Sequence, residues 1–284
     1  MISPDLHWAM LRIRMVERAI ADRYRRGHMR CPVHLSIGQE AAAVGVAAAL
    51  RPVDVAFSTH RCHAHYLALG GDLQSMIDEL HGLPMGCNGG RGGSMHLQSD
   101  RLVASLPIVG SALPVAAGWA WADAMAGRDR VTVVFLGDAA LEEGAWHETA
   151  NLARLKRLPL FFVVENNQFS IHTPIRQRQP MRPLTDLALA HGIPAANCPG
   201  NDVESVRIAA AAAVDSIRRE GGPRLLVIDV WRWAEHCGVD IRPDHDAELW
   251  RALDPLGSFE PPEEFGADAA EIDRAFDRAE AANG

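Results

Sequence analysis

The chain has 284 residues and a net charge of −8, and 48% of its residues are hydrophobic. This acidic balance argues against a nucleic-acid partner, which would call for a basic face. The apolar stretches near 41–50 and 112–126 are too short to span a bilayer, so we expect no membrane partner. The five cysteines form no CxxC pair and no signal peptide precedes them, which predicts reduced thiols and a cytoplasmic protein.

Two helices are expected in the N-terminal segment. Apolar residues recur at a helical spacing over 4–26, and the pattern stops before a glycine. A cluster of arginines begins in this helix, and we expect it to form a solvated face or a subunit contact rather than an anion site. Ser36 and Gln39 have the spacing of a capping box, which would open a second helix over 38–50.

A helix capped by Asp72 is expected next, followed by a glycine-rich loop over 82–93. Such a loop suggests nucleotide binding, but this one follows a helix rather than a strand and lacks GxGxxG. We interpret it chiefly as a flexible structural loop, with direct substrate contact as the alternative. Residues 110–126 are apolar and small, which predicts a buried helix that packs closely.

From residue 131 onward, strand and helix patterns alternate. The expected elements are a strand at 131–136, a helix at about 144–156, a strand at 160–165, a short helix after about 182, an extended piece at 193–198, a helix at about 203–220, a strand at 225–233 and an acidic tail over about 244–284. This alternation predicts an α/β fold with a doubly wound, mostly parallel sheet flanked by helices. No break in composition marks a second domain, so residues 1–284 are expected to form a single domain.

The two strands of this βαβ unit are followed by side chains that carry oxygen. Asp138 follows the first strand and Asn167 follows the second. Parallel strands end at the same edge of a sheet, so these side chains should emerge together and could hold a hard cation against a phosphate. Gly137 lets the backbone approach a diphosphate, and Glu142 and Glu143 complement the dipole of the following helix. The alternative is a helix cap and a turn.

Residues 131–169 resemble the thiamine-diphosphate fingerprint, in which GDG is followed later in the chain by NN. The surrounding sequence is similar to the α subunit of 2-oxo acid dehydrogenase first components, including the pyruvate, branched-chain and acetoin types. The resemblance covers roughly residues 10–256. Its further motifs are IGQEAAAVG (37–45), FSTHRCHAHYLALGGD (57–72), GGRGGSMHL (89–97), ASLPIVGSALPVAAG (104–118), LPLFFVVENN (158–167), PGNDV (199–203), GPRLLVIDVWRW (222–233) and LDPL (253–256).

The resemblance implies a thiamine-diphosphate-binding fold and a site shared between two kinds of subunit. The α subunit would hold Mg²⁺ and the diphosphate, and a β subunit would complete the site in an α2β2 heterotetramer. The implied reaction cleaves a C–C bond next to a carbonyl, in a 2-oxo acid or acetoin, and passes the acyl unit to a lipoyl domain or another carrier thiol. The alternatives are ketol transfer from a ketose, as in transketolases, and a non-catalytic scaffolding paralogue.

By the same resemblance, the side chains of Asp138 and Asn167 and the carbonyl of Phe169 ligate the metal. Arg61 aligns with the arginine that holds the diphosphate, and the backbone of Val109 faces the aminopyrimidine ring. The implied cofactor-binding residues are Arg61, His60, Val109, Gly137, Asp138, Ala139, Ala140, Asn167, Phe169, Arg232 and His236.

The resemblance aligns His34 with a substrate-side histidine and His236 with an active-site histidine. We also expect His63 to be catalytic, near the diphosphate or the substrate, with plain packing as the alternative. Imidazole suits this chemistry because it can donate or accept a proton near neutral pH. The segment HRCHAH, which contains His63, would also suggest zinc. However, ligands at i and i+2 do not share a helix face, and no distant CxxC or HxxxH completes a site.

The sequence departs from the family pattern at several positions. Ala139 replaces the second glycine of GDG, and Pro107 stands where family members often have glycine. In the segment WRWAEHCGVDIRPD, Ala234 replaces a histidine and Cys237 replaces a regulated serine. This loop and the tail also look shortened, which leaves the donor and the acceptor of the reaction open.

Overall fold

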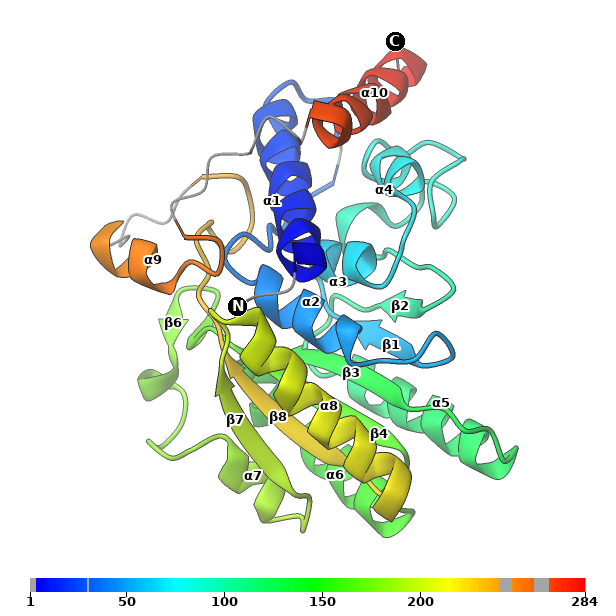
Figure 1. The fold of residues 1–284 in the computed structure, drawn as a ribbon, viewed down its shortest axis with the longest axis vertical. Helices are drawn as coiled ribbons and strands as arrows, with labels where there is room; N and C mark the ends of the chain where they lie inside the picture. The colour runs from blue at the N-terminus through cyan, green and yellow to red at the C-terminus, as the bar shows by residue number, and fades with distance from the viewer. Residues whose placement is uncertain (1–3, 30, 241–246, 258–265, 284) are drawn as a thin grey trace.

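The computed structural model describes residues 4–29, 31–240, 247–257 and 266–283 (Figure 1). A six-stranded sheet with the order β2-β1-β3-β4-β8-β7 forms its centre, and every pairing in it is parallel. Its strands are β1 (Val55–Ser58), β2 (Leu102–Ser105), β3 (Thr132–Gly137), β4 (Leu160–Asn166), β7 (Ala195–Pro199) and β8 (Arg224–Asp229). A two-stranded hairpin lies beyond β4 and consists of β5 (Phe169–Ser170) and β6 (Thr173–Pro174).

Helices cover both faces of the sheet. They are α1 (Pro4–Tyr24), α2 (Glu40–Ala48), α3 (His63–Ala68), α4 (Leu73–Leu80), α5 (Ala112–Met125), α6 (Gly144–Leu155), α7 (Thr185–Leu189), α8 (Val203–Glu220), α9 (Ala247–Leu253) and α10 (Gly266–Asn283). Short 3₁₀ turns are η1 (Gly93–Met95), η2 (Asp138–Glu142) and η3 (Ile175–Gln177). The predicted α/β class with a doubly wound parallel sheet is confirmed.

The alternation of side chains along the central strands builds two cores. In β4, Phe161 and Val163 pack with α8 and α2, whereas Phe162 and Val164 pack with α5, α6 and α7. All four side chains are fully buried, as expected for a parallel strand covered on both faces. Because successive residues point to opposite faces, an apolar run becomes the shared wall of both layers.

The strand order places a topological switch point between β1 and β3. The chain leaves β1 toward β2 at one edge and then returns to β3, from which it proceeds through β4 toward β8 and β7. Loops that leave β1 and β3 therefore diverge and open a crevice at the carboxyl ends of the strands. The residues after these strands, Thr59 and Asp138, stand at that crevice.

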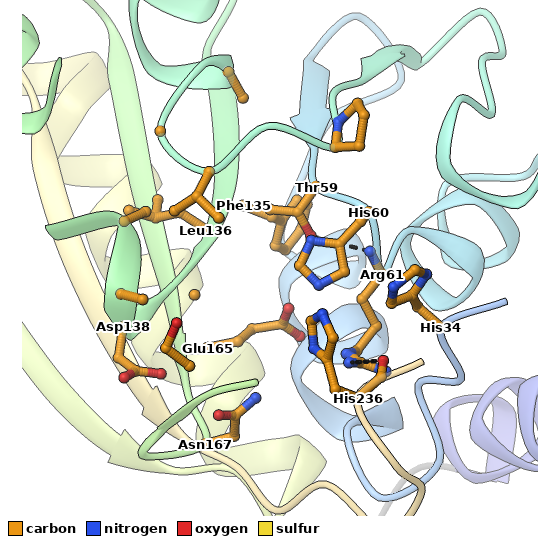
Figure 2. A pocket seen from close by; sticks show the side chains of 18 of the residues that line it. His34, Thr59, His60, Arg61, Phe135, Leu136, Asp138, Glu165, Asn167 and His236 are labelled. Carbon is orange, nitrogen blue, oxygen red and sulfur yellow. Dashed lines mark hydrogen bonds between the residues drawn. The ribbon is translucent and has the colours of Figure 1, made fainter. Parts of the chain in front are cut away.

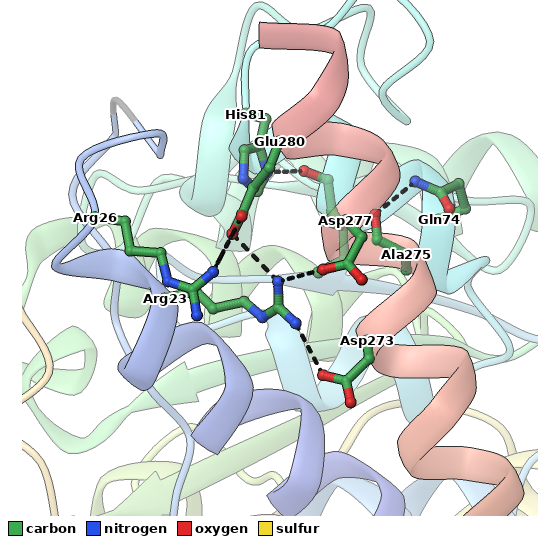
Figure 3. A network of polar contacts seen from close by, with 9 residues as sticks. Arg23, Arg26, Gln74, His81, Asp273, Ala275, Asp277 and Glu280 are labelled. Carbon is green, nitrogen blue, oxygen red and sulfur yellow. Dashed lines mark hydrogen bonds and ion pairs between the residues drawn. The ribbon is translucent and has the colours of Figure 1, made fainter. Parts of the chain in front are cut away.

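Two arginines of α1, Arg12 and Arg23, pair with the last helix, which lies against it (Figure 3). Arg23 donates to Asp273 at 2.9 Å and to Asp277 at 2.8 Å, and its guanidinium lies 5.0 Å from the ring of Phe276. Arg12 contacts the N-terminal part of α10 through Asp268 and Glu271. The acidic tail is thus the partner of the basic helix.

Three details of the predicted elements are wrong. No side-chain hydrogen bond caps α2, and the hydroxyl of Ser36 finds no partner among the described residues, so the capping box does not form. The helix α5 is not buried, because one side of it is exposed, including Trp119 at 38%. Strands β1 and β2 were not expected, since each has only four residues.

Among the described helices, none has the length and apolarity needed to cross a membrane.

Candidate active site

A cavity of about 330 Å³ occupies the switch point (Figure 2). Loops from the carboxyl ends of β1, β2, β3 and β4 contribute to its walls, together with the segment after β8. Its lining includes His34, His60, Arg61, Val109, Gly137, Asp138, Ala139, Ala140, Asn167, Phe169, Arg232 and His236. The structure therefore brings together every implied cofactor-binding residue, although they come from five segments of the chain.

Asp138 and Asn167 stand at neighbouring strand ends, as their positions predicted. Gly137 pairs with Glu165 in the register of β3 and β4, so Asp138 lies one residue and Asn167 two residues beyond a paired position. Asp138 is 1% exposed, and the side chain of Asn167 accepts a hydrogen bond from the backbone of Phe169 at 3.0 Å. A carboxylate and an amide oxygen at neighbouring strand ends are hard donors that suit Mg²⁺, and Phe169 lines the same cavity. Their role as metal ligands stays a prediction.

Arg178, a candidate for a basic residue near the entrance of the site, contacts the carboxylate of Asp138, which the sequence did not predict. It also contacts Glu142, which therefore does more than complement a helix dipole. Burial raises the pKa of Asp138, and the guanidinium of Arg178 opposes that rise. The buried carboxylate is thereby given a cationic partner.

The histidines at positions 34, 60 and 236 form a cluster opposite Asp138. The ring centroid of His34 lies 4.8 Å from that of His60 and 5.1 Å from that of His236. Burial, followed by the charge of Arg61, lowers the pKa of His34 to about 3, of His60 to about 2 and of His236 to about 4. All three rings are therefore neutral at pH 7 and present both a donor and an acceptor.

These three rings could in principle hold a metal ion, since one ligand atom from each lies within 4.8 Å of the others. The positive charges of the buried Arg61 and Arg232 help to lower the pKa of all three histidines. The field of these charges disfavours a cation and favours an anion. Nδ1 of His34 is buried without a partner among the described residues and is available to a ligand.

Arg61 ties two of the histidine segments together. Its Nη1 donates to the carbonyl of Leu35 at 2.5 Å, and its Nη2 donates to the carbonyl of His236 at 3.1 Å. Burial, with the nearby charge of Arg232, lowers the pKa of Arg61 to about 10, so it stays charged at neutral pH. Arg232 donates to the carbonyl of Ile171 at 2.9 Å and fixes the loop beyond β5. Arg61 and Arg232 therefore order the segments around the cavity as well as charging it.

Glu165 is a cavity residue that sequence reasoning missed. Its carboxylate extends from the end of β4 toward the histidine cluster (Figure 2). Nε2 of the buried His65 lies 3.3 Å from it, and Nδ1 of His65 lies 2.8 Å from the hydroxyl of Ser58. The available signal was its position directly before the asparagine pair, at the carboxyl end of a buried strand.

His63, expected to be catalytic, does not line the cavity. Its Nδ1 lies 3.0 Å from the carboxylate of Glu17, and its Nε2 lies 2.7 Å from the hydroxyl of Ser94. All three side chains are fully buried. Because both ring nitrogens are engaged behind the wall, the structure supports a positioning role for His63 rather than contact with a substrate.

The glycine-rich loop is held in place rather than loose. The buried carboxylate of Glu79 accepts hydrogen bonds from the backbone of Asn88, Gly90, Gly92 and Gly93, at 2.7 to 3.0 Å. The loop leads into η1, whose Met95 lines the cavity. The interpretation of this segment as a flexible structural loop is therefore corrected to an anchored loop that supports one wall.

The positions that depart from the family pattern lie at or near the cavity. Pro107 and Ala139 line it, Ala234 is buried and Cys237 is exposed. The backbone of Ala139 does not have a positive φ, so alanine is accommodated without strain. The loop WRWAEHCGVDIRPD after β8 is described as far as residue 240, and its predicted shortening stays a prediction.

A model of the dehydrogenase E1 component family matches residues 8–260 of this chain. The chain belongs to that family. The α subunit of the pyruvate dehydrogenase E1 component from Porphyra purpurea is 35% identical over 263 residues, which cover 88% of this chain and 76% of the relative. The α subunit of acetoin:2,6-dichlorophenolindophenol oxidoreductase from Bacillus subtilis (strain 168) is 36% identical over 239 residues, covering 84% and 72%. The resemblance drawn from the motifs is confirmed.

The fold is also found in transketolases. The transketolase from Leishmania mexicana superposes with a TM-score of 0.64 at 19% identity, covering 100% of this chain and 46% of that one. This chain thus spans less than half of the transketolase chain, and the likeness concerns the fold alone. Membership of the E1 component family makes the chain a subunit of a thiamine-diphosphate-dependent enzyme.

Proposed function

We propose that this E1 component subunit holds the diphosphate of thiamine diphosphate through Mg²⁺ at the carboxyl ends of β3 and β4. The observation that carries the proposal is the convergence of Asp138, Asn167 and Phe169 on a cavity that also holds buried guanidiniums. Oxygen donors would bind the metal, and Arg61 and Arg232 would attract the phosphate oxygens. When bound, the cofactor would supply the electron sink for cleaving a bond next to a carbonyl.

The residues of this chain would orient the substrate and handle its protons. Neutral His34 and His236 can each donate a hydrogen bond to a carbonyl oxygen or accept a proton at a ring nitrogen. Arg61 fixes the backbone of both segments, so their rings start from a defined geometry. The surrounding apolar wall, which includes Leu106 and Ile108, limits the access of water.

The donor is proposed to be a 2-oxo acid or acetoin, as in the names of the relatives. Both the relatives and the family model favour this chemistry over ketol transfer from a ketose. The retention of both Asp138 and Asn167 on the cavity wall argues against a non-catalytic scaffold. The acceptor is proposed to be a lipoyl domain or another carrier thiol. The five unpaired cysteines support a cytoplasmic enzyme.

A β subunit is proposed to dock on the exposed side of α5 and complete the site, within an α2β2 assembly. Val115 is 46% exposed, Trp119 is 38% exposed and Met125 is 80% exposed, and α6 adds Leu155 at 72%. The patch continues to the cavity through Ile108, which is 72% exposed and lines it. An apolar surface of this kind at the mouth of a site fits a partner that closes the site.

The metal and cofactor assignment is tested with Asp138→Asn. Removing the carboxylate charge should weaken Mg²⁺-dependent binding of thiamine diphosphate at least about 100-fold, because the amide is a poorer ligand. Calorimetry on the full chain with its co-purified partner would measure this. Asp186→Asn, a change in α7 away from the cavity, is the matched control. Equal cofactor affinity in wild type and Asp138→Asn would refute the assignment.

The docking surface is tested with Val115→Glu. A charge in the middle of the patch should prevent co-purification of the β subunit and abolish turnover, while the circular dichroism of the chain stays unchanged. Ile208→Glu on α8, which is 56% exposed on the opposite side of the sheet, should have no such effect. Retention of the partner by Val115→Glu would place the interface elsewhere.

A further inference from the structure

Arg178, which does not line the cavity, forms an ion pair with the cavity carboxylate of Asp138. Nη2 of Arg178 contacts Oδ2 of Asp138, and Nη1 of the same guanidinium contacts Glu142. The Nε atom donates to the carbonyl of Thr173 at 3.2 Å. The side chain is 9% exposed, so it is held in one position by three separate groups.

The segment that carries Arg178 is itself tied down. The backbone of Ile175 donates to the carbonyl of Gln168 at 2.8 Å, and the backbone of Arg178 donates to the carbonyl of Ile175 at 2.9 Å. Gln179 donates to the carboxylate of Glu142 at 3.0 Å. The turn after β6 is therefore folded back onto η2, which contains Asp138 and Glu142.

The charges of this group leave the carboxylate suited to a cation. Asp138 and Glu142 are negative and Arg178 is positive, so the three together carry one negative charge. Glu142 offsets the guanidinium, and Asp138 keeps its attraction for a positive ion. A lone arginine at this position would instead oppose metal binding.

The contact with Arg178 also fixes the orientation of the Asp138 carboxylate. The terminal torsion of an aspartate is broad, so its carboxylate turns easily unless a partner fixes it. Arg178 occupies Oδ2 and leaves Oδ1 unclaimed by the guanidinium. Asp138 and Asn167 both line the cavity, and Figure 2 shows them on the same side of it, across from the histidines. Ligands of a metal are commonly fixed in this way by an outer hydrogen bond.

We propose that Arg178, supported by Glu142, is a positioning residue that fixes Asp138 so that its Oδ1 faces Asn167 as a ready-made ligand for a divalent cation. This rests on the proposed function, because it concerns the same metal site. Arg178 acts through Asp138 and is not a catalytic residue.

The test measures binding of Mn²⁺ to the full chain with its co-purified partner, by the loss of the free-ion signal in electron paramagnetic resonance. Arg178→Gln should weaken Mn²⁺ binding by about 10- to 100-fold, the usual effect of losing an outer-layer partner. Arg178→Lys should restore part of the loss, because it keeps the charge but not the planar fork. Arg176→Gln, an exposed change in the same turn, should bind Mn²⁺ like wild type.

A second variant keeps the proposal testable if Arg178→Gln folds poorly. Glu142→Gln retains the Arg178–Asp138 contact but leaves the guanidinium charge unbalanced, so Mn²⁺ binding should weaken by less. Unchanged Mn²⁺ affinity in both variants would overturn the proposal, and so would tighter binding in Arg178→Gln, which would make the guanidinium a competitor. If wild type itself bound no Mn²⁺ with thiamine diphosphate present, the proposed metal site would fail instead.

Discussion

His34, His60 and His236 meet at the cavity although they belong to three separate segments of the chain. Burial and two neighbouring guanidiniums keep their rings uncharged at neutral pH. A neutral imidazole can give and take a proton at its two nitrogens, which an imidazolium cannot do. The low pKa of each ring therefore suits hydrogen bonding by the neutral imidazole, because a general base at pH 7 would need a pKa closer to 7.

The same pKa shifts predict how stability depends on pH. Each histidine titrates near 6.5 in the unfolded chain but at about 4 or below in the folded one, so the unfolded chain binds more protons in between. The contribution of these histidines to the free energy of unfolding should be fully present above pH 6.5. It should decrease as the pH is lowered, by up to about 1.4 kcal/mol per pH unit for each ring. His60→Gln should flatten this slope in urea unfolding curves. His7→Gln on α1 should leave it unchanged, and an identical slope in both variants would contradict the assignment.

The glycine-rich loop shows how one buried side chain can order a whole segment. Several of its glycines have positive φ, and Gly86 and Gly90 also lie so close to other groups that a Cβ would clash. A glycine-rich segment has a large conformational entropy to lose. The carboxylate of Glu79 offsets that loss with four backbone hydrogen bonds, which makes the loop a fixed support for the cavity wall.

Glu79→Gln should release this loop. The amide offers one acceptor oxygen in place of two and turns its NH₂ group toward backbone donors, which should cost about 2–4 kcal/mol of stability. Hydrogen exchange should rise over residues 86–93, and denaturant unfolding would give the change in free energy. Glu148→Gln on the exposed side of α6 is the matched control. Equal protection of the loop in both variants would show that Glu79 does not anchor it.

Ion pairs connect the first helix of the described chain, α1, with its last helix, α10. The first helix carries the arginines and the last helix carries the carboxylates that pair with them (Figure 3). Separate exposed ion pairs contribute little, but here one arginine contacts three carboxylates and covers an aromatic ring. Behind them, Ile272 and Phe276 are buried against the core of the sheet domain. The ion pairs therefore set the position of a helix that apolar burial holds.

Arg23→Gln should loosen α10 without unfolding the sheet. The network has partly exposed partners, so we expect a loss of about 1 kcal/mol that shrinks at high salt. Faster proteolysis within α10 at low salt would be the measurement, with the exposed Arg18→Gln on the same helix as its control. If cleavage rates matched at every salt concentration, apolar contacts alone would position α10.

Much of the fold could be predicted because its signals are local. The runs that became β3, β4 and β8 are apolar and bounded by polar or glycine residues, and Asp72 caps α4 as expected. The short strands β1 and β2 gave no such signal, because four residues do not establish a period. The exposed side of α5 was taken for buried because apolar composition does not distinguish a core from a docking surface.

The sequence alone was sufficient to predict the family, the parallel sheet and the placement of Asp138 and Asn167 at neighbouring strand ends. The reason is that the connection in a βαβ unit determines which strand ends lie at the same edge of the sheet. Contacts between segments that are distant in the sequence could be seen only in the tertiary structure. Examples are the contact of Arg178 with Asp138, the approach of Glu165 to the histidine cluster and the burial of His63 behind the cavity wall. Side-chain pairs of this kind depend on how loops cross in space, and no periodicity in the sequence records that.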